Sequence, residues 1–334
     1  MSTEPLPPYV YRCEDRSILL GPYKRTIVPL WGWCIPRWLP ANMITLGSSA
    51  CMWLVLGLSL NASAFSTPTF VLVALVLTQA YLAYDHLDGM QAKATGTSSA
   101  LGEYLDHSLD TYHGAILTLS AFALIGTFPT WLLLVVLWSG FMAFAATMIE
   151  EKERGSIFFG CFGTIEAIFL FVLFYLSCLI PGVRAWWSAP LFGSWPAYWI
   201  LVIAGGIGCV GTTADCLRRT GRLPVQLAAF VGVNLVLALA LSKSTASLAY
   251  VVAVMFLHGG DYVGRVIGTH VLRRPHAWPD VVGPVLALAL PYEPTGLMPL
   301  LLVWLAWRWA SGVWHVVSPL RGDWRWVNPP LKSP

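Results

Sequence analysis

Four aspartates, Asp85, Asp88, Asp106 and Asp110, lie within 26 residues of a largely apolar sequence. The first two are three residues apart and the last two are four apart, so each pair shares one face of a helix. Four carboxylates in a low-dielectric setting repel one another unless cations neutralise them. Oxygen ligands favour hard divalent ions, and two such ions about 4 Å apart are a recurrent device for displacement at phosphorus. The pattern predicts a site for two Mg²⁺ ions, for which Mn²⁺ can substitute.

A purely structural role for these acids, in ion pairs or helix caps, is the alternative. Lys93 is the one Lys or Arg residue close to them in the sequence, so ion pairing would leave most of the negative charge unbalanced. Gly102 precedes Asp106 by four residues and lies on the same helical face. The absence of a side chain there lets a ligand or a neighbouring helix come close. These features favour a functional site.

The elements that carry these acids are predicted to be membrane-spanning helices. Of the 334 residues, 57% are hydrophobic and 11% are charged, whereas about 25% of the residues of soluble proteins are charged. This composition excludes a disordered chain and a nucleic-acid-binding tail. The seven cysteines form no CxxC pair, which argues against a secreted disulfide scaffold and against a zinc site.

About ten helices are expected, with eight to ten as the range, because Pro291 and Pro294 interrupt the last pair. A span needs about 20 predominantly apolar residues. The apolar stretches near this length lie at residues 43–61, 67–84, 111–128, 130–149, 157–180, 196–215, 224–242, 246–264, 279–292 and 295–313.

Positive residues predict which way the spans face. Eighteen of the 20 Lys and Arg residues fall in the amino-terminal segment, the even-numbered loops and the tail, and the odd-numbered loops hold Arg184 and Lys243. Because Lys and Arg remain with cytoplasmic loops, both termini are expected in the cytoplasm. Residues 1–26 contain no apolar core of a cleavable signal peptide. The first pair of aspartates then closes the second span and the second pair opens the third, so all four meet at the cytoplasmic boundary.

These residues belong to a longer pattern with fixed spacing, made by Asp85, Asp88, Gly89, Ala92, Lys93, Gly102, Asp106 and Asp110. The pattern resembles the signature of the CDP-alcohol phosphotransferases, and this resemblance implies an all-α, polytopic membrane bundle with the fold of that family. All but one of the eight positions agree with the signature. Lys93 stands where the family has Arg, which keeps a cation for phosphate but loses the bidentate fork.

Flanking residues are similar to the choline and ethanolamine phosphotransferase branch. The similar segments are Pro40–Thr45, Gln91, Thr95–Ser98, Leu101–Glu103, His107, Glu150–Glu151 and Gly160–Glu166. The resemblance implies transfer of phosphocholine or phosphoethanolamine from its CDP ester to diacylglycerol, or to a related lipid alcohol such as ceramide, with release of CMP. The rival is a CDP-diacylglycerol-dependent transfer to inositol, serine or glycerol phosphate, which would use the same metal cluster with the substrates reversed.

The resemblance also implies roles for single residues. His107 matches the general base proposed for this branch, and an imidazole with an ordinary pKa of about 6.5 accepts a hydroxyl proton near neutral pH. Asp110 is the competing base. The residues that would admit or bind the nucleotide and headgroup are Asn42, Gly89, Gln91, Lys93, Gly102 and Glu166.

Other polar residues are interpreted from their place in the predicted spans. Glu166 would pair with a headgroup ammonium, and a hydrogen bond between helices is the alternative. Glu150 and Glu151 are expected in a cytoplasmic loop, where they are either solvated or close over the site. Three further residues are interpreted as satisfied polar groups between helices: His113, His258 and Asp261.

The chain is expected to divide into an interfacial segment at residues 1–40, a catalytic bundle at 41–215, further helices at 216–315 for packing or a homodimer surface, and a cytoplasmic tail at 316–334. Fifteen Arg against five Lys favours a bacterial inner membrane, with the endoplasmic reticulum or Golgi as the eukaryotic counterpart. Membrane lipid is an expected partner and nucleic acid is not. A divalent-cation transporter would also use intramembrane acids, but it has no need for Gly and Ala at fixed spacing.

Overall fold

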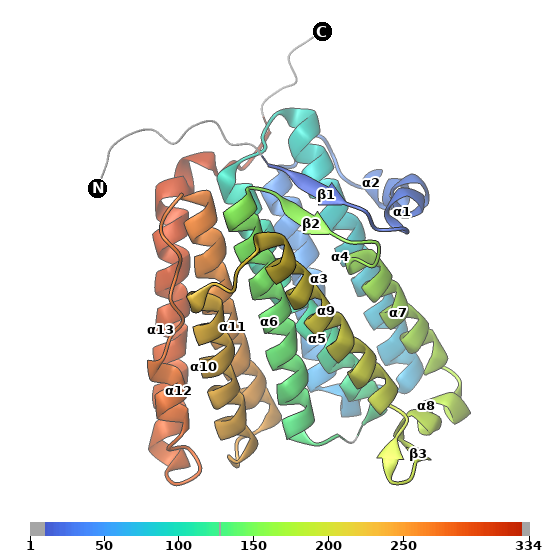
Figure 1. Ribbon diagram of the computed structural model, residues 1–334. Coiled ribbons are helices and arrows are strands. Elements are labelled where there is room, and N and C mark those ends of the chain that lie inside the picture. Colours follow the sequence, from blue (N-terminus) through green and yellow to red (C-terminus); the bar gives the residue numbers. More distant parts are fainter. Residues whose placement is uncertain (1–10, 127, 329–334) are drawn as a thin grey trace.

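Helices make up most of the molecule, and the prediction of an all-α membrane bundle is confirmed. The computed structural model describes residues 11–126 and 128–328. Figure 1 shows long helices running side by side, with the described chain beginning and ending at the same end of the bundle. The helices are α1 (Leu20–Thr26), α2 (Val28–Gly32), α3 (Ala41–Leu60), α4 (Thr67–Thr95), α5 (Ala100–Ile125), α6 (Thr130–Arg154), α7 (Thr164–Ser177), α8 (Pro181–Ser188), α9 (Trp199–Thr220), α10 (Val225–Ser242), α11 (Leu248–Val271), α12 (Val282–Ala287) and α13 (Pro294–Leu320). The short strands are β1 (Cys13–Asp15), β2 (Ile157–Phe159), β3 (Pro190–Phe192) and β4 (Trp195–Pro196).

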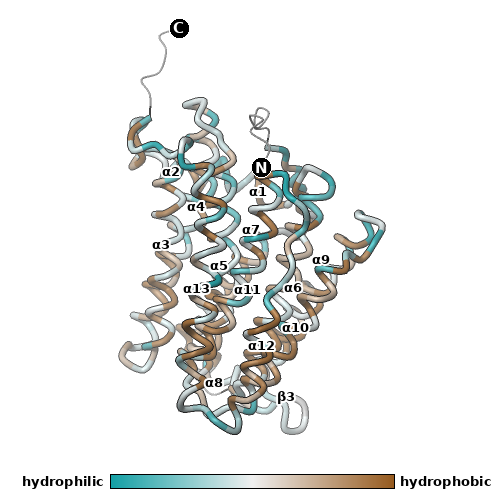
Figure 2. The backbone as a smooth tube through the Cα atoms, turned by 90° about the vertical axis from the view of Figure 1, so that its left-hand side faces the viewer, coloured by the Kyte–Doolittle hydropathy of each residue, from teal (hydrophilic) through white to brown (hydrophobic). Residues whose placement is uncertain are grey.

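Seven helices of the described chain are long and apolar enough to cross a membrane: α3, α4, α6, α9, α10, α11 and α13. An eighth is added if α7 and α8, which meet at a bend of 113°, form one broken span. Figure 2 shows apolar residues along most of the bundle and polar residues gathered at the end that holds α1 and α2. The lower edge of the expected range is reached only if α7 and α8 count as one span, and ten separate spanning helices are not found in the described residues.

The stretch 279–292 was expected to be a spanning helix, and this prediction is wrong. It contains α12, which has six residues, between segments that are not helical. Prolines at both ends of the stretch lack the N–H that an internal helical residue donates. The Asp280 carboxylate accepts hydrogen bonds from the Gly283 N–H at 2.8 Å and the Trp304 indole at 3.1 Å. Irregular backbone inside an apolar bundle is tolerated where it is hydrogen-bonded in this way.

The predicted span 157–180 also differs in the structure. Helix α6 ends at Gly155, whose φ of 69° lies in the left-handed region that glycine adopts readily. The next residues form β2, which pairs in parallel with β1 so that Cys13 lies opposite Ile157. Helix α7 begins only at Thr164. The pairing attaches the amino-terminal segment to the end of the bundle where α6 finishes.

His258 and Asp261 in the carboxyl-terminal helices have polar partners, as expected. His258 Nδ1 lies 3.1 Å from Asn234 Oδ1. Asp261 accepts hydrogen bonds from Arg265 at 2.6 Å and from Arg308 at 3.1 Å. A charge inside an apolar bundle needs such a partner, so these residues hold α11 against its neighbours.

Helix α3 packs against both α4 and α5 and joins them by polar contacts. Ser48 donates a hydrogen bond to the Tyr81 carbonyl of α4 at 3.0 Å. Ser49 Oγ lies 3.0 Å from His113 Nε2 of α5. These contacts fix the relative positions of the two helices that carry the four aspartates.

Candidate metal and catalytic site

Helices α4 and α5 form a hairpin that places Asp85 and Asp110 at about the same distance from the turn between the helices. Helix α4 ends at Thr95, and Gly96 after it has a left-handed φ of 63°. Helix α5 starts after Ser99, whose hydroxyl accepts a hydrogen bond from the Gly102 N–H at 3.1 Å. Asp85 lies 11 residues before Gly96 and Asp110 lies 11 residues after Ser99. Because every helical residue rises about 1.5 Å, the two are about equally far from the turn.

Asp85, Asp106 and Asp110 converge in the structure. Each offers a carboxylate oxygen, and these three atoms all lie within 4.8 Å of one another. All three residues are partly exposed, so their oxygens are accessible to an ion. The Tyr81 hydroxyl donates to Asp110 Oδ1 at 3.4 Å, and His113 Nδ1 lies 2.9 Å from the same oxygen.

Asp88 is separate from this trio. Its side chain is buried. The Thr45 hydroxyl donates to Oδ2 at 2.5 Å, and the Gly89 N–H donates to Oδ1 at 2.5 Å. The structure therefore brings together three of the four predicted ligands, and α3 holds the fourth one helical turn away from Asp85.

The trio has the chemistry of a divalent-cation site. Its donors are carboxylate oxygens only, which favour Mg²⁺ or Mn²⁺ over zinc. Within residues 11–126 and 128–328, no Lys or Arg nitrogen lies within ion-pair distance of these carboxylates. Neighbouring carboxylates without basic partners are stabilised by a bound cation. The geometry favours a metal site over the alternative of structural ion pairs.

His107 projects from α5 toward α6. Its Nδ1 lies 3.3 Å from Glu151 Oε2, and its Nε2 lies 4.0 Å from Asp106 Oδ2. Glu103, His107 and Glu151 form a second group whose ligand atoms lie within 4.8 Å of one another, and all three are buried. The ring of Tyr11 lies next to the imidazole at a tilt of 58°, with the ring centroids 5.9 Å apart. His107 thus lies between the aspartate trio and this second acidic group.

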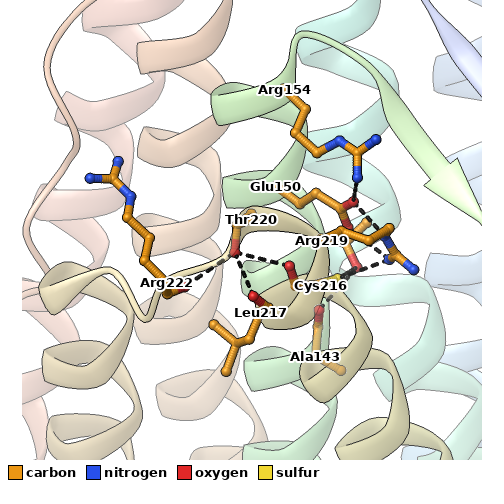
Figure 3. A network of polar contacts seen from close by, with 9 residues as sticks. Ala143, Glu150, Arg154, Cys216, Leu217, Arg219, Thr220 and Arg222 are labelled. Carbon is orange, nitrogen blue, oxygen red and sulfur yellow. Dashed lines mark hydrogen bonds and ion pairs between the residues drawn. The ribbon is translucent and has the colours of Figure 1, made fainter.

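Glu150 and Glu151 were expected in a cytoplasmic loop, but both lie in α6 and are buried. Figure 3 shows Glu150 between Arg219 of α9 and Arg154. Arg219 donates to it at 2.6 and 2.8 Å, and Arg154 donates at 3.4 Å. A bidentate guanidinium offsets the cost of burying this carboxylate, so α6 continues past its apolar stretch. Glu151 faces α5 instead.

Glu166 has a folding role that the predicted headgroup contact did not include. Its Oε2 accepts a hydrogen bond from the Gly163 N–H at 2.7 Å, and its Oε1 accepts one from the Leu19 N–H at 2.8 Å. The first bond caps α7, and the second attaches the amino-terminal segment to it. Because both oxygens are engaged, the geometry favours the alternative of hydrogen bonding between segments.

Gln91 supports the loop that precedes α3. Its Nε2 donates to the backbone oxygens of Pro36, Arg37 and Leu39 at 3.0 to 3.2 Å. Asn328, near the other end of the chain, donates to two of the same oxygens, those of Arg37 and Leu39, at 2.9 and 2.8 Å. Gln91 therefore holds a loop, and its contact with a nucleotide stays a prediction.

The two predicted glycines differ in their surroundings. A Cβ on Gly102 would lie 3.2 Å from Asn42 Oδ1, so the missing side chain lets α3 come close. A Cβ on Gly89 would meet nothing within 4 Å, which leaves space for a ligand beside the acids. Lys93 is exposed on the last turn of α4. Gly89 and Lys93 remain the candidates for contact with substrate on this helix.

Thr45, Tyr81 and Glu103 touch the site without having been predicted from the sequence. Glu103 precedes His107 by four residues, and this helical spacing was the available signal for their proximity. Thr45 and Tyr81 lie on other helices, and no local spacing links them to the aspartates. Their positions follow only from the packing of α3 against α4 and α5.

Comparison with known proteins agrees with the family resemblance of the sequence. Residues 38–206 match the family model described as CDP-alcohol phosphatidyltransferase. Cholinephosphotransferase 1 of Gallus gallus is 29% identical over 254 residues, 67% of this chain and 74% of that protein. Cholinephosphotransferase 1 of Xenopus laevis is 25% identical over 333 residues, 89% of this chain and 80% of that protein. Ethanolaminephosphotransferase 1 of Mus musculus is 28% identical over 221 residues, 60% of this chain and 53% of that protein, so the chain spans about half of its length.

Proposed function

This chain belongs to the CDP-alcohol phosphatidyltransferase family, and from this we propose its reaction. The reaction is transfer of phosphocholine or phosphoethanolamine from its CDP ester to the hydroxyl of diacylglycerol, with release of CMP. The observation that carries the proposal is the convergence of Asp85, Asp106 and Asp110 beside His107. The names of the relatives support a choline or ethanolamine headgroup.

The three converging aspartates would hold the divalent metal, and we propose two Mg²⁺ ions at this position. When bound, the ions supply positive charge that binds the pyrophosphate and stabilises the leaving oxygen of CMP. Asp88, which Thr45 now holds by a hydrogen bond, would complete the ligand set after a rotation of its side chain. Gly89 leaves room for the nucleotide to approach, and Lys93 would contact a phosphate.

His107 is the proposed general base, and its two nitrogens have different surroundings. Nδ1 lies beside the Glu151 carboxylate, so in the neutral ring the proton belongs on Nδ1. This leaves the Nε2 lone pair, on the side of Asp106, to accept the proton of the attacking hydroxyl. Asp110, the competing base, already interacts with Tyr81 and His113, which favours His107.

The substrates would reach this site from two directions. Asp85 and Asp110 lie 11 residues from the turn between α4 and α5, about 16 Å along a helix, and Asp88 and Asp106 lie closer to it. We propose that this end of the bundle faces the cytoplasm, as the distribution of Lys and Arg indicates. The CDP ester would arrive from water, and diacylglycerol would enter sideways from the membrane.

The experiment that tests this proposal is CMP release by the purified protein in detergent with Mg²⁺. CDP-choline, CDP-ethanolamine and CDP-diacylglycerol are each supplied with and without diacylglycerol or a soluble polyol. The proposal expects release that requires both diacylglycerol and a CDP-amino alcohol. Release from CDP-diacylglycerol alone would instead support the rival phosphatidyl transfer.

A further inference from the structure

Glu151 is a buried carboxylate, and the proposed reaction assigns it no positively charged partner. Its side chain is 3% exposed, and its contact within ion-pair distance is His107 Nδ1 at 3.3 Å. No Lys or Arg nitrogen comes this close to it anywhere in the described ranges 11–126 and 128–328. The preceding residue, Glu150, is buried to the same degree but pairs with Arg219 and Arg154. A buried carboxylate is unfavourable without a positive partner, so Glu151 is suited to binding a cation.

His107 gives a second and independent sign of a ligand at this place. Its side chain is 7% exposed, and its Nδ1 makes no hydrogen bond of normal geometry in the described part of the chain. Buried polar atoms are nearly always hydrogen-bonded, and the exceptions concentrate at functional sites. The other acid of the group, Glu103, lies 3.2 Å from His270 Nε2. Glu151 is therefore the member of this group that lacks a basic partner besides His107.

Tyr11 adds an aromatic face to the group. Its ring centroid lies 5.9 Å from that of His107. Desolvation, together with the negative charges of Glu151 and Asp106, raises the pKa of Tyr11, so the phenol is neutral and lies close to these carboxylates. The Ile157 N–H donates to the Arg12 carbonyl at 3.0 Å, which fixes the backbone beside Tyr11. An aromatic ring next to a carboxylate is the chemistry that recognises an organic ammonium.

We propose that Glu151 and Tyr11 bind the ammonium end of the transferred headgroup. This inference rests on the proposed function. Asp106 and Glu151 approach opposite nitrogens of the His107 ring, so a phosphate bound through metal ions at the aspartates and an ammonium bound at Glu151 would lie on two sides of the proposed base. The two-carbon arm of choline or ethanolamine links these two groups. A soluble acceptor without a positive charge would not be bound more tightly through the Glu151 carboxylate.

The test uses a neutral isostere of the substrate. In CDP-3,3-dimethylbutanol a carbon atom replaces the choline nitrogen, so the molecule keeps its shape and loses its charge. We expect the wild-type protein to prefer CDP-choline over the isostere by roughly tenfold or more in kcat/KM, because a desolvated ammonium interacts with both a carboxylate and a ring. Glu151→Gln should reduce this preference to about threefold or less, because any effect that acts through His107 changes both substrates alike and the ratio then reports the ammonium contact.

Matched variants separate binding from support of the fold. Glu150→Gln changes an equally buried acid on the same helix, whose partner is Arg219, and should keep the full preference. Tyr11→Phe should keep it, because the ring face remains. Tyr11→Leu should weaken CDP-choline by about threefold to tenfold more than the isostere. Since Tyr11 is exposed, this variant carries the test if Glu151→Gln fails to fold.

Two results would overturn the inference while the proposed function stands. One is equal use of CDP-choline and its isostere by the wild-type protein. The other is an equal loss with both substrates in Glu151→Gln, which would mean that Glu151 only supports His107. If the wild-type protein uses no CDP-amino alcohol at all, the proposed function itself fails and the headgroup site fails with it.

Discussion

Two adjacent glutamates of α6 show that the partner of a buried carboxylate decides whether it supports the fold or is available to a ligand. Glu150 and Glu151 are buried to nearly the same degree, but Glu150 meets two guanidinium groups and Glu151 meets an imidazole. The same holds for the aspartates, because Asp88 is hydrogen-bonded by Thr45 while the other three lie together with no Lys or Arg partner among the described residues. A carboxylate with a fixed partner contributes to stability, and one without such a partner is available to a ligand.

Asp106→Asn should lower kcat for CMP release by at least about 10²-fold, because a neutral amide replaces a carboxylate of the proposed metal site. The measurement is turnover of the CDP ester at saturating Mg²⁺. Asp215→Asn is the control, since Asp215 is exposed on α9 and should keep full activity. Full turnover by the Asp106 variant would mean that the trio is not the metal site.

His107→Ala should lower kcat by about 10² to 10⁴-fold, the range for loss of a general base. The Mg²⁺ concentration that gives half-maximal activity should stay unchanged, because the aspartate trio is intact. Steady-state kinetics over a Mg²⁺ series measures both quantities. His315→Ala removes an exposed histidine of α13 and serves as control. Retained kcat in the His107 variant would assign the proton transfer to Asp110.

At the scale of helices, the turn between α4 and α5 and the close packing around α5 place the acids. The turn is readable from the sequence, because Gly96 stops one helix and Ser99 starts the next. The packing around α5 is harder to predict from the sequence. A Cβ on Gly260 of α11 would lie 2.5 Å from Tyr112 Cζ of α5, so the two helices approach through a position where only glycine fits.

Gly260→Ala should destabilise the protein by about 1 to 3 kcal/mol, because the new methyl group overlaps the Tyr112 ring. A lower midpoint of thermal unfolding in detergent would show this effect. Gly47→Ala on α3 is the matched control, since a Cβ there meets nothing within 4 Å. It should be neutral or slightly stabilising, because alanine favours helix over glycine. Equal midpoints for the two variants would contradict this packing.

Hydrophobic patterns predicted most helices but failed where tertiary partners decide the backbone. The stretch 279–292 is apolar enough for a span, yet its prolines and the capping carboxylate of Asp280 limit α12 to six residues. Helix α6 extends to Arg154 because Arg219 comes from α9 to neutralise Glu150. Spacing along one chain segment predicted the aspartates. It gave no sign of Tyr11, which reaches His107 only through the pairing of β1 with β2.

At the scale of the whole molecule, the two ends of the described chain support the same end of the bundle. β1 pairs with β2 beside α6, and Asn328 donates to the carbonyls of Arg37 and Leu39 before α3. Polar residues concentrate at this end and apolar residues cover the rest (Figure 2). We propose that this end lies in the cytoplasm, with the site at the boundary between water and lipid.

This orientation predicts which cysteines a membrane-impermeant maleimide reaches in sealed vesicles. Cys13 and Cys161 are exposed near β1 and β2 and should be labelled only when the cytoplasmic face is outside. Lys243→Cys, at the end of α10, should be labelled only from the opposite face. Detergent should allow both reactions and serves as the control. The reverse pattern would place the site on the other side of the membrane.

The most direct test of the central claim follows the phosphate itself. CDP-choline or CDP-ethanolamine carrying radioactive phosphorus at the phosphate next to the alcohol is incubated with the purified protein, diacylglycerol and Mg²⁺. The proposed reaction predicts that the label enters the lipid phase while unlabelled CMP is released, and that a chelator or Asp106→Asn stops both. Label recovered only in water-soluble phospho-alcohol, or left in the CDP ester while CDP-diacylglycerol is consumed, would contradict headgroup transfer to diacylglycerol.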